Sequence, residues 1–176
     1  MIVETYVNSL YDNPGNTTHR YWITDGLPIM VGGSLLGPAD WEHLRKDFGI
    51  TDVVNVETEH DDVGKLPAEN LCQVQVPDDG TPFSAEAVLS VCLFASCKLY
   101  RSVPSGGPKF YVHCQMGGSR SPAFAYAIMR SAFGMSAADA LAAIREVRGG
   151  DYGTKPYHVS YISSIEAALA PVLGGR

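Results

Sequence analysis

The run "KFYVHCQMGGSRSP" (residues 109–122) constrains the fold of this chain more than any other segment. Its first six residues are apolar in the middle, which is typical of a buried central strand. Gly117 and Gly118 then permit a tight turn, and the residues from Arg120 onward have the apolar spacing of a helix. The segment therefore predicts one strand–turn–helix unit of an α/β protein.

Strand-like and helix-like patterns alternate along the rest of the chain, and helices dominate its later part. Predicted strands cover residues 27–33, 50–58, 71–76 and 109–114. Predicted helices cover residues 37–49, 84–103, 120–133, 136–148 and 157–173, with Ser84 as the N-cap of the second. This order predicts an α/β fold with a mostly parallel central sheet flanked by helices on both faces.

The length of 176 residues is most economically one domain. We expect residues 23–176 to form it, and the polar, turn-rich residues 1–22 to be an N-terminal extension that packs on the domain or leads into it. A net charge of −6 argues against a general nucleic-acid binder, which needs a basic face to neutralise phosphates. A basic pocket inside an acidic protein remains compatible with this charge.

The chain has no apolar run of about 18 residues, so no membrane span is expected. Its first residues have neither the basic start nor the apolar core of a signal peptide. These features predict a cytoplasmic protein with reduced cysteines. Three of these cysteines are expected to pack in the core: Cys72, Cys92 and Cys97.

Residues 114–120 have the composition of an anion-binding loop. They begin where a predicted strand ends, and ligands of α/β proteins collect at the carboxyl ends of strands. The backbone N–H groups of such a loop can converge on a phosphate, and the N-terminus of the following helix adds a positive field. The residues expected to bind phosphate are Gln115, Met116, Gly117, Gly118, Ser119 and Arg120.

Cys114 is the candidate nucleophile of this loop, and it alone of the four cysteines has an arginine six positions later. A cysteine beside an arginine or at a helix N-terminus can have a pKa of roughly 3.5–7.5, and its thiolate can attack phosphorus. Arg120 offers a planar pair of donors that matches two phosphate oxygens. We expect Ser121 to hydrogen-bond the sulfur, and His113 to shape the loop through hydrogen bonds to its backbone.

The leaving oxygen of a phosphate ester needs a proton, and the segment "VPDDGTP" (76–82) is placed to supply it. It directly follows a predicted strand and so reaches the same edge of the sheet. Asp78 is the expected general acid and Asp79 the reserve. The choice between them stays open, because turns also favour aspartate for purely structural reasons.

These segments resemble the protein tyrosine phosphatase superfamily, and specifically its dual-specificity branch. "VHCQMGGSRSP" (112–122) resembles the signature His-Cys-x5-Arg-Ser, "VQVPDD" (74–79) the general-acid loop, and residues 29–59 the opening strand, helix and next strand. The segment "GGDYGTKPYHVS" (149–160) lacks the glutamine of the long tyrosine-specific enzymes, which favours the dual-specificity branch. The resemblance implies that Cys114, Arg120 and Asp78 are catalytic and that no metal or other cofactor is needed.

Other interpretations of the same residues are less favoured. Cys114 and Arg120 could be a structural cysteine beside a solvated arginine, but the glycine turn argues against this. Zinc binding through His113 and Cys114 lacks a second Cys/His pair at ligand spacing. The acidic run "ETEHDD" (57–62) is expected to be a solvated loop rather than a metal site.

The leading functional prediction is a phosphatase that acts on phosphotyrosine in proteins, with phosphoserine and phosphothreonine as further candidate targets. The alternatives are a phosphatase for a phosphoinositide, a phosphoglucan or an RNA 5′ end, and a phosphate-binding module without catalysis. Lipid-directed relatives often carry basic residues inside the loop, whereas residues 115–119 are neutral here. The physiological substrate, the preferred phosphoamino acid, redox control and the oligomeric state stay open.

Overall fold

The computed structural model of the protein describes residues 21–22, 26–34, 37–101 and 107–174. The expected N-terminal extension lies almost wholly outside these residues, so the division of the chain at residue 22 stays a prediction. Within the described residues, no helix is both long enough and apolar enough to cross a lipid bilayer.

A five-stranded sheet in the order β1-β2-β5-β3-β4 forms the centre of the fold. Four strands run parallel to one another, and β1 pairs with β2 in the antiparallel direction. The strands are β1 (Tyr21–Trp22), β2 (Ile29–Gly32), β3 (Asp52–Asn55), β4 (Leu71–Gln73) and β5 (Phe110–His113). The predicted mostly parallel sheet is therefore confirmed, with a short antiparallel edge that the sequence pattern did not indicate.

The three inner strands β2, β3 and β5 are buried along their whole length, including the polar Asp52 and Asn55 at the two ends of β3. Their register places Gly32, Asn55 and His113 side by side at the carboxyl edge of the sheet. The chain leaves the sheet there and enters the loops that carry the candidate site. The strands are shorter than predicted because those loop residues were counted as part of them.

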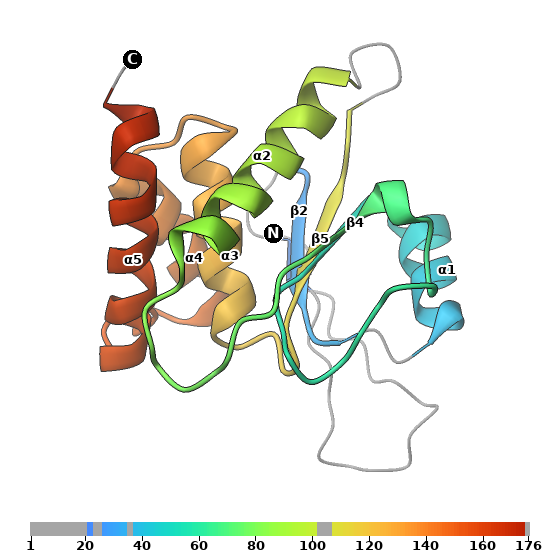
Figure 1. Ribbon diagram of the computed structural model, residues 1–176, viewed down its shortest axis with the longest axis horizontal. Helices are drawn as coiled ribbons and strands as arrows, with labels where there is room; N and C mark the ends of the chain where they lie inside the picture. Colours follow the sequence, from blue (N-terminus) through green and yellow to red (C-terminus); the bar gives the residue numbers. More distant parts are fainter. Residues whose placement is uncertain (1–20, 23–25, 35–36, 102–106, 175–176) are drawn as a thin grey trace.

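Helices cover both faces of the sheet, as predicted (Figure 1). One face packs on α1 (Pro38–Asp47), whose Leu44 joins an apolar cluster with Met30, Val53 and Tyr111. The other face carries the remaining helices. These are α2 (Ala85–Arg101), α3 (Arg120–Ser131), α4 (Ala137–Arg148) and α5 (Pro156–Leu173).

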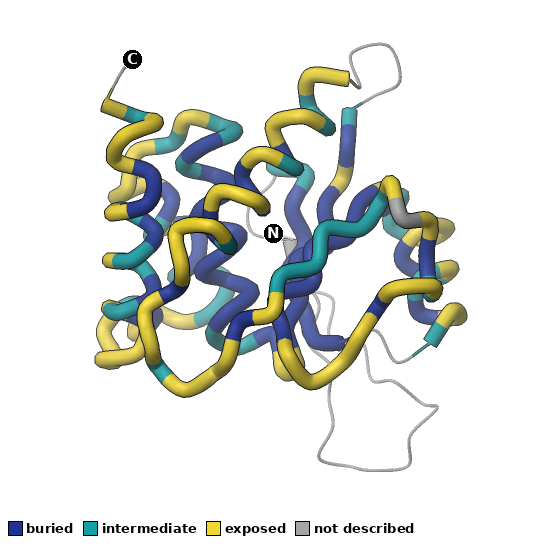
Figure 2. Tube along the Cα trace, in the orientation of Figure 1, coloured by how far each residue is buried: buried dark blue, intermediate teal, exposed yellow. Residues whose placement is uncertain are grey.

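Helix α3 lies in the middle of this second layer, against the sheet and between its neighbours (Figures 1 and 2). Every residue of α3 except Arg130 is buried. The helix begins directly after the glycine turn of residues 114–119, so this turn is attached to both the central strand and the central helix. The strand and the helix thereby hold the two ends of the loop that carries the candidate site.

Two details of α2 test the sequence predictions. The Ser84 hydroxyl accepts a hydrogen bond from the backbone N–H of Ala87 at 3.2 Å, which confirms the predicted N-cap. Cys92 is buried as expected, and Cys72 on β4 is partly buried, but Cys97 is exposed. The prediction that Cys97 packs in the core was wrong.

Candidate active site

The segment from Cys114 to Arg120 forms a loop at the carboxyl end of β5. The Cys114 side chain is buried, and its backbone N–H donates to the Gly32 carbonyl at 3.4 Å. The Ser34 N–H donates to the Gln115 carbonyl at 3.2 Å. The loop is therefore tied to the end of the neighbouring strand β2 as well as to its own strand.

Gly117 is required by the backbone of this loop. Its φ of +71° lies in the left-handed region that favours glycine. A Cβ atom at this position would lie only 2.6 Å from the carbonyl carbon of Gly32. The loop can pass this close to β2 only because Gly117 has no side chain.

The sulfur of Cys114 and the hydroxyl oxygen of Ser121 are 3.4 Å apart, which is hydrogen-bonding distance for sulfur. Both side chains are buried beneath the loop. The contact between Ser121 and the sulfur that the sequence predicted is thus present. The Ser121 hydroxyl also lies 3.4 Å from the Gly32 carbonyl oxygen, so its one proton can be donated either to this carbonyl or to the sulfur.

Arg120 is fully buried, which rules out the interpretation of a solvated arginine. Its Nη1 donates to Glu59 Oε2 at 2.9 Å and to the Val76 carbonyl at 2.8 Å, and its Nη2 donates to Glu59 Oε1 at 2.8 Å. Burial acts to lower the pKa of Arg120, but Glu59, Cys114 and Asp78 outweigh it and raise the pKa above its ordinary value. The guanidinium therefore stays charged inside the protein.

The Nε atom of Arg120 has no hydrogen-bond partner among the described residues, although it is buried. The nearest carboxylate oxygen to it is Oδ2 of Asp78, at 3.6 Å. A buried charged donor without a partner is costly unless a ligand satisfies it. The unsatisfied Nε is consistent with the expected phosphate ligand.

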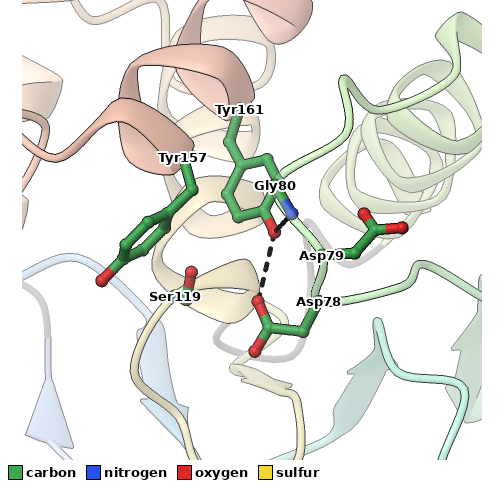
Figure 3. A pocket seen from close by; sticks show the side chains of 6 residues that line it. All are labelled: Asp78, Asp79, Gly80, Ser119, Tyr157 and Tyr161. Atoms are coloured by element: carbon green, nitrogen blue, oxygen red, sulfur yellow. Dashed lines mark hydrogen bonds between the residues drawn. The ribbon is translucent and has the colours of Figure 1, made fainter.

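Asp78 and Asp79 lie in different surroundings (Figure 3). Asp78 approaches Arg120 and accepts a hydrogen bond from the Tyr161 hydroxyl at 3.1 Å. Asp79 instead accepts hydrogen bonds from the backbone and hydroxyl of Thr81, which lower the pKa of its carboxyl below the usual range. The Asp79 carboxyl thus stabilises its own turn by binding Thr81, whereas the Asp78 carboxyl points toward Arg120.

His113 lies beneath the loop but does not have the partners we expected. Its hydrogen bond goes to the side chain of Asp62, at 2.7 Å, rather than to the loop backbone. Its other ring nitrogen is 3.6 Å from a carboxylate oxygen of Glu57, which in turn accepts a 2.7 Å hydrogen bond from Ser34. His113 is therefore held between two carboxylates, both of them fully buried.

The acidic segment 57–62 is only in part the solvated loop that the sequence suggested: residues 58–61 are exposed, but Glu57 and Asp62 at its two ends are buried. Glu57 and Asp62 contact His113, and Glu59 binds Arg120, so the segment contacts residues at both ends of the 114–119 loop. The prediction missed these three residues. The available signal was their position directly after β3, because the carboxyl end of that strand lies beside the carboxyl end of β5.

Two cavities lie beside the loop. One has a volume of about 370 Å³ and is lined by Asp78, Asp79, Gly80, Ser119, Tyr157 and Tyr161 (Figure 3). The other has a volume of about 240 Å³ and is lined by Gly118, Ser119, Arg148, Asp151, Tyr152, Lys155, Tyr157 and His158. Ser119 lines both, and its buried hydroxyl has no hydrogen-bond partner within the described part of the chain. Gln115 and Met116 are exposed on the outer side of the loop.

The described residues contain no group of three or more side chains that could hold a metal ion. Glu57 accepts a hydrogen bond from Ser34, and Asp62 is hydrogen-bonded to Asn55, His113 and Lys65. The site therefore brings together three reactive groups: the buried thiol of Cys114, the buried guanidinium of Arg120, and the carboxyl of Asp78, which lies 3.6 Å from that guanidinium.

Solved structures of phosphatases share this fold. The human tyrosine phosphatase-like serine/threonine/tyrosine-interacting protein is 20% identical with a TM-score of 0.63, and the match covers 88% of this chain and 97% of that one. Human DUSP28 is 21% identical with a TM-score of 0.60, and the match covers 84% and 93%. PTPMT1 in complex with PI(5)P is 16% identical with a TM-score of 0.61, and the match covers 87% and 98%.

A comparison with curated protein sequences gives no significant match. The family model described as "Dual specificity phosphatase, catalytic domain" does match, over residues 38–166. This range covers more than half of the chain and includes Asp78, Cys114 and Arg120. The chain belongs to the dual-specificity phosphatase family and is a cysteine-based phosphatase, so its substrates are phosphorylated.

Proposed function

We propose that the protein hydrolyses phosphotyrosine, and also phosphoserine or phosphothreonine, in protein substrates through a phosphocysteine intermediate. The observation that carries the proposal is the approach of Asp78 to Arg120, at 3.6 Å, beside the loop that holds Cys114. A nucleophile, an oxyanion ligand and a proton donor at one edge of the sheet are the parts that such a reaction needs.

In the first step, the Cys114 thiolate attacks phosphorus and forms the P–S bond while the bond to the leaving oxygen breaks. Asp78, protonated in this step, gives its proton to the leaving oxygen, so a neutral phenol or alcohol departs. Arg120 and the loop N–H groups hold the equatorial phosphate oxygens, on which the negative charge lies in the transition state. The Nε of Arg120 is the donor left available for this contact by Glu59.

In the second step, a water molecule attacks the phosphorus of phosphocysteine. Asp78, now a carboxylate, takes a proton from this water, and inorganic phosphate forms as the P–S bond breaks. The departing sulfur regains negative charge, which the Ser121 hydroxyl can stabilise with a hydrogen bond over the 3.4 Å separation. The enzyme returns to its starting state with water as the only co-reactant.

The side chains of the loop support a singly phosphorylated target. Gln115, Met116 and Ser119 carry no charge, and Gly117 and Gly118 carry no side chain. One phosphate is therefore matched by Arg120 and the backbone, with no additional cation inside the loop. Together with the net charge of −6, this favours a phosphoamino acid of a protein over a nucleic-acid end or a strongly anionic lipid surface. A cytoplasmic location, as the sequence predicted, fits such substrates.

A phosphoinositide or another polyphosphorylated small molecule is the second candidate substrate. The 240 Å³ cavity beside Gly118 and Ser119 is lined by Arg148, Lys155 and His158. This cavity could accept a second phosphate of the same substrate, since cations and N–H donors are the groups that bind phosphate. The candidate is weaker, because Lys155 lies 3.8 Å from Asp151 and is partly neutralised.

A phosphate-release assay without metal and with chelator tests the proposal. The substrates are phosphotyrosine and phosphothreonine peptides, a phosphoinositide, a phosphorylated glucan and a 5′-phosphorylated RNA, and Cys114→Ser is the control. We expect turnover of the peptides and none by Cys114→Ser. Preference for the phosphoinositide, with a loss in Lys155→Gln that the peptides do not show, would favour the second candidate. Peptide binding without any turnover would instead identify a non-catalytic module.

A further inference from the structure

Helix α5 holds the loop of residues 77–83 in place through three hydrogen bonds. The Tyr161 hydroxyl donates to Asp78 Oδ1 at 3.1 Å and accepts from the Gly80 N–H at 3.1 Å. The Ser164 hydroxyl accepts from the Phe83 N–H at 3.1 Å. The loop that carries the candidate acid is thus bound to a long helix on both sides of its turn.

The Tyr161 ring cannot easily leave this position. It is fully buried, and it stacks on Phe83 with the ring centroids 4.2 Å apart and an interplanar angle of 16°. Burial is the main reason that the pKa of Tyr161 is raised above its ordinary value, and Asp78 adds to the increase. The hydroxyl therefore stays protonated at neutral pH and remains a donor to Asp78.

We infer that Tyr161 is a positioning residue for the general acid: its hydroxyl aims the Asp78 carboxyl at the leaving oxygen. This inference rests on the proposed function, in which Asp78 protonates the leaving oxygen. Gly80, by occupying the acceptor side of the same hydroxyl, directs the proton of Tyr161 toward Asp78.

Other charged groups around Asp78 act on it as well. Arg120, at the start of α3, has its Nε 3.6 Å from Asp78 Oδ2, and Glu59 offsets part of the positive charge of Arg120. His158 on α5 interacts electrostatically with Asp78. Cys114 interacts electrostatically with Arg120, which lies beside Asp78. Asp79 is the remaining carboxylate of the loop and is turned toward Thr81. Among these groups, Tyr161 is the one that donates a hydrogen bond to Asp78 in the structure.

The dependence on the leaving group separates this role from a structural one. A p-nitrophenolate ion leaves without a proton, whereas phenol, tyrosine and alkyl leaving groups need one. Loss of the Tyr161 hydroxyl should therefore reduce kcat/KM about tenfold for phenyl phosphate and less than about twofold for p-nitrophenyl phosphate.

The experiment compares Tyr161→Phe, Asp78→Asn and Tyr126→Phe on both substrates across pH. Tyr126→Phe is the matched control, since its buried hydroxyl also bonds a carboxylate, that of Glu166, away from the site. Tyr126→Phe should behave as wild type, and thermal unfolding should show that Tyr161→Phe is folded.

An equal loss on both substrates in Tyr161→Phe would overturn the inference, provided that Asp78→Asn shows the leaving-group dependence. If Asp78→Asn lacks that dependence too, the acid assignment itself fails, and the proposed mechanism falls together with the role of Tyr161. The two failures are distinguishable because each is read from a different variant.

Discussion

Glu59 and Arg120 form a two-point ion pair in which both carboxylate oxygens accept from the two terminal nitrogens of the guanidinium, at 2.9 and 2.8 Å. Glu59 follows β3, whereas Arg120 begins α3. The pair fixes the plane of the guanidinium, so its Nε edge is the part left to bind a phosphate. The hydrogen bonds from Arg120 also lower the pKa of Glu59 below its ordinary value, and the pair stays ionised at neutral pH.

Replacing Glu59 by glutamine should reduce kcat/KM by about tenfold, because one neutral oxygen cannot hold both nitrogens of Arg120. The measurement is steady-state hydrolysis of phosphotyrosine peptide. Glu69→Gln is the control, since Glu69 is exposed on a short 3₁₀ turn. Equal activities of the two variants would contradict a positioning role for Glu59.

Gly117→Ala should abolish activity by disrupting the loop. The substitution combines a left-handed φ of +71°, which costs about 1–2 kcal/mol, with a contact of 2.6 Å to Gly32. Gly134→Ala is a close match, because Gly134 has a φ of +67° but an added Cβ would meet nothing within 4 Å. We expect turnover to fall at least about 100-fold in Gly117→Ala and to stay near wild type in Gly134→Ala. A comparable loss in both variants would show that backbone strain, and not the close approach to β2, decides the effect.

Asp62 should make the stability of the protein sensitive to acid. Burial acts to raise the pKa of Asp62, but His113 and Lys65 outweigh it, so the folded-state pKa lies below the ordinary value. A carboxyl with a lowered pKa contributes stability above its unfolded pKa, about 3.9, and this contribution is lost as the pH falls further through the folded value.

Urea unfolding from pH 7 to pH 2.5 checks this expectation. Asp62→Asn should be less stable than wild type by about 1–3 kcal/mol at pH 7, and the difference should shrink below about pH 4. Asp61→Asn serves as the neighbouring exposed control, and at pH 7 it should destabilise the protein less than Asp62→Asn does. A constant difference between Asp62→Asn and wild type over this range would contradict the ionic role of Asp62.

The cysteines should differ in their reaction with iodoacetamide. Burial raises the pKa of Cys72 to about 11 and also raises the pKa of Cys92, so at pH 8 both are almost entirely unreactive thiols. Cys97 is exposed. In a Cys114→Ser background, mass spectrometry should find Cys97 alkylated first, and Cys72 and Cys92 only after unfolding. Early labelling of Cys72 would mean that β4 opens readily at the edge of the sheet.

The sequence predicted the parts of the site that lie in short continuous segments. Cys114, Arg120 and Ser121 are within eight residues of one another, and a strand–glycine–helix pattern determines their arrangement locally. The sequence did not predict that Glu57 and Asp62 are buried. Their partners Ser34 and His113 lie 23 and 51 residues away, and only the assembled sheet brings them together.

The error at Cys97 has a simpler physical origin. Cys92 and Cys97 are five residues apart on α2, which places their side chains about 140° apart around the helix axis. One of them can face the core only if the other turns toward solvent. The angular positions of the two cysteines around the helix would therefore have predicted that only one of them is buried. The apolar composition of the segment, which we used instead, does not distinguish them.

Because α3 is buried on all sides, we expect the loop of residues 114–119 to stay folded only as long as the whole domain does. Backbone amides of a helix enclosed in this way exchange with solvent deuterium only when the protein opens globally. The loop of residues 114–119 ends on this helix and cannot loosen while the helix stays packed. On heating, catalytic activity and tertiary structure should disappear in one transition, so the temperature at which the enzyme stops working is the temperature at which it unfolds.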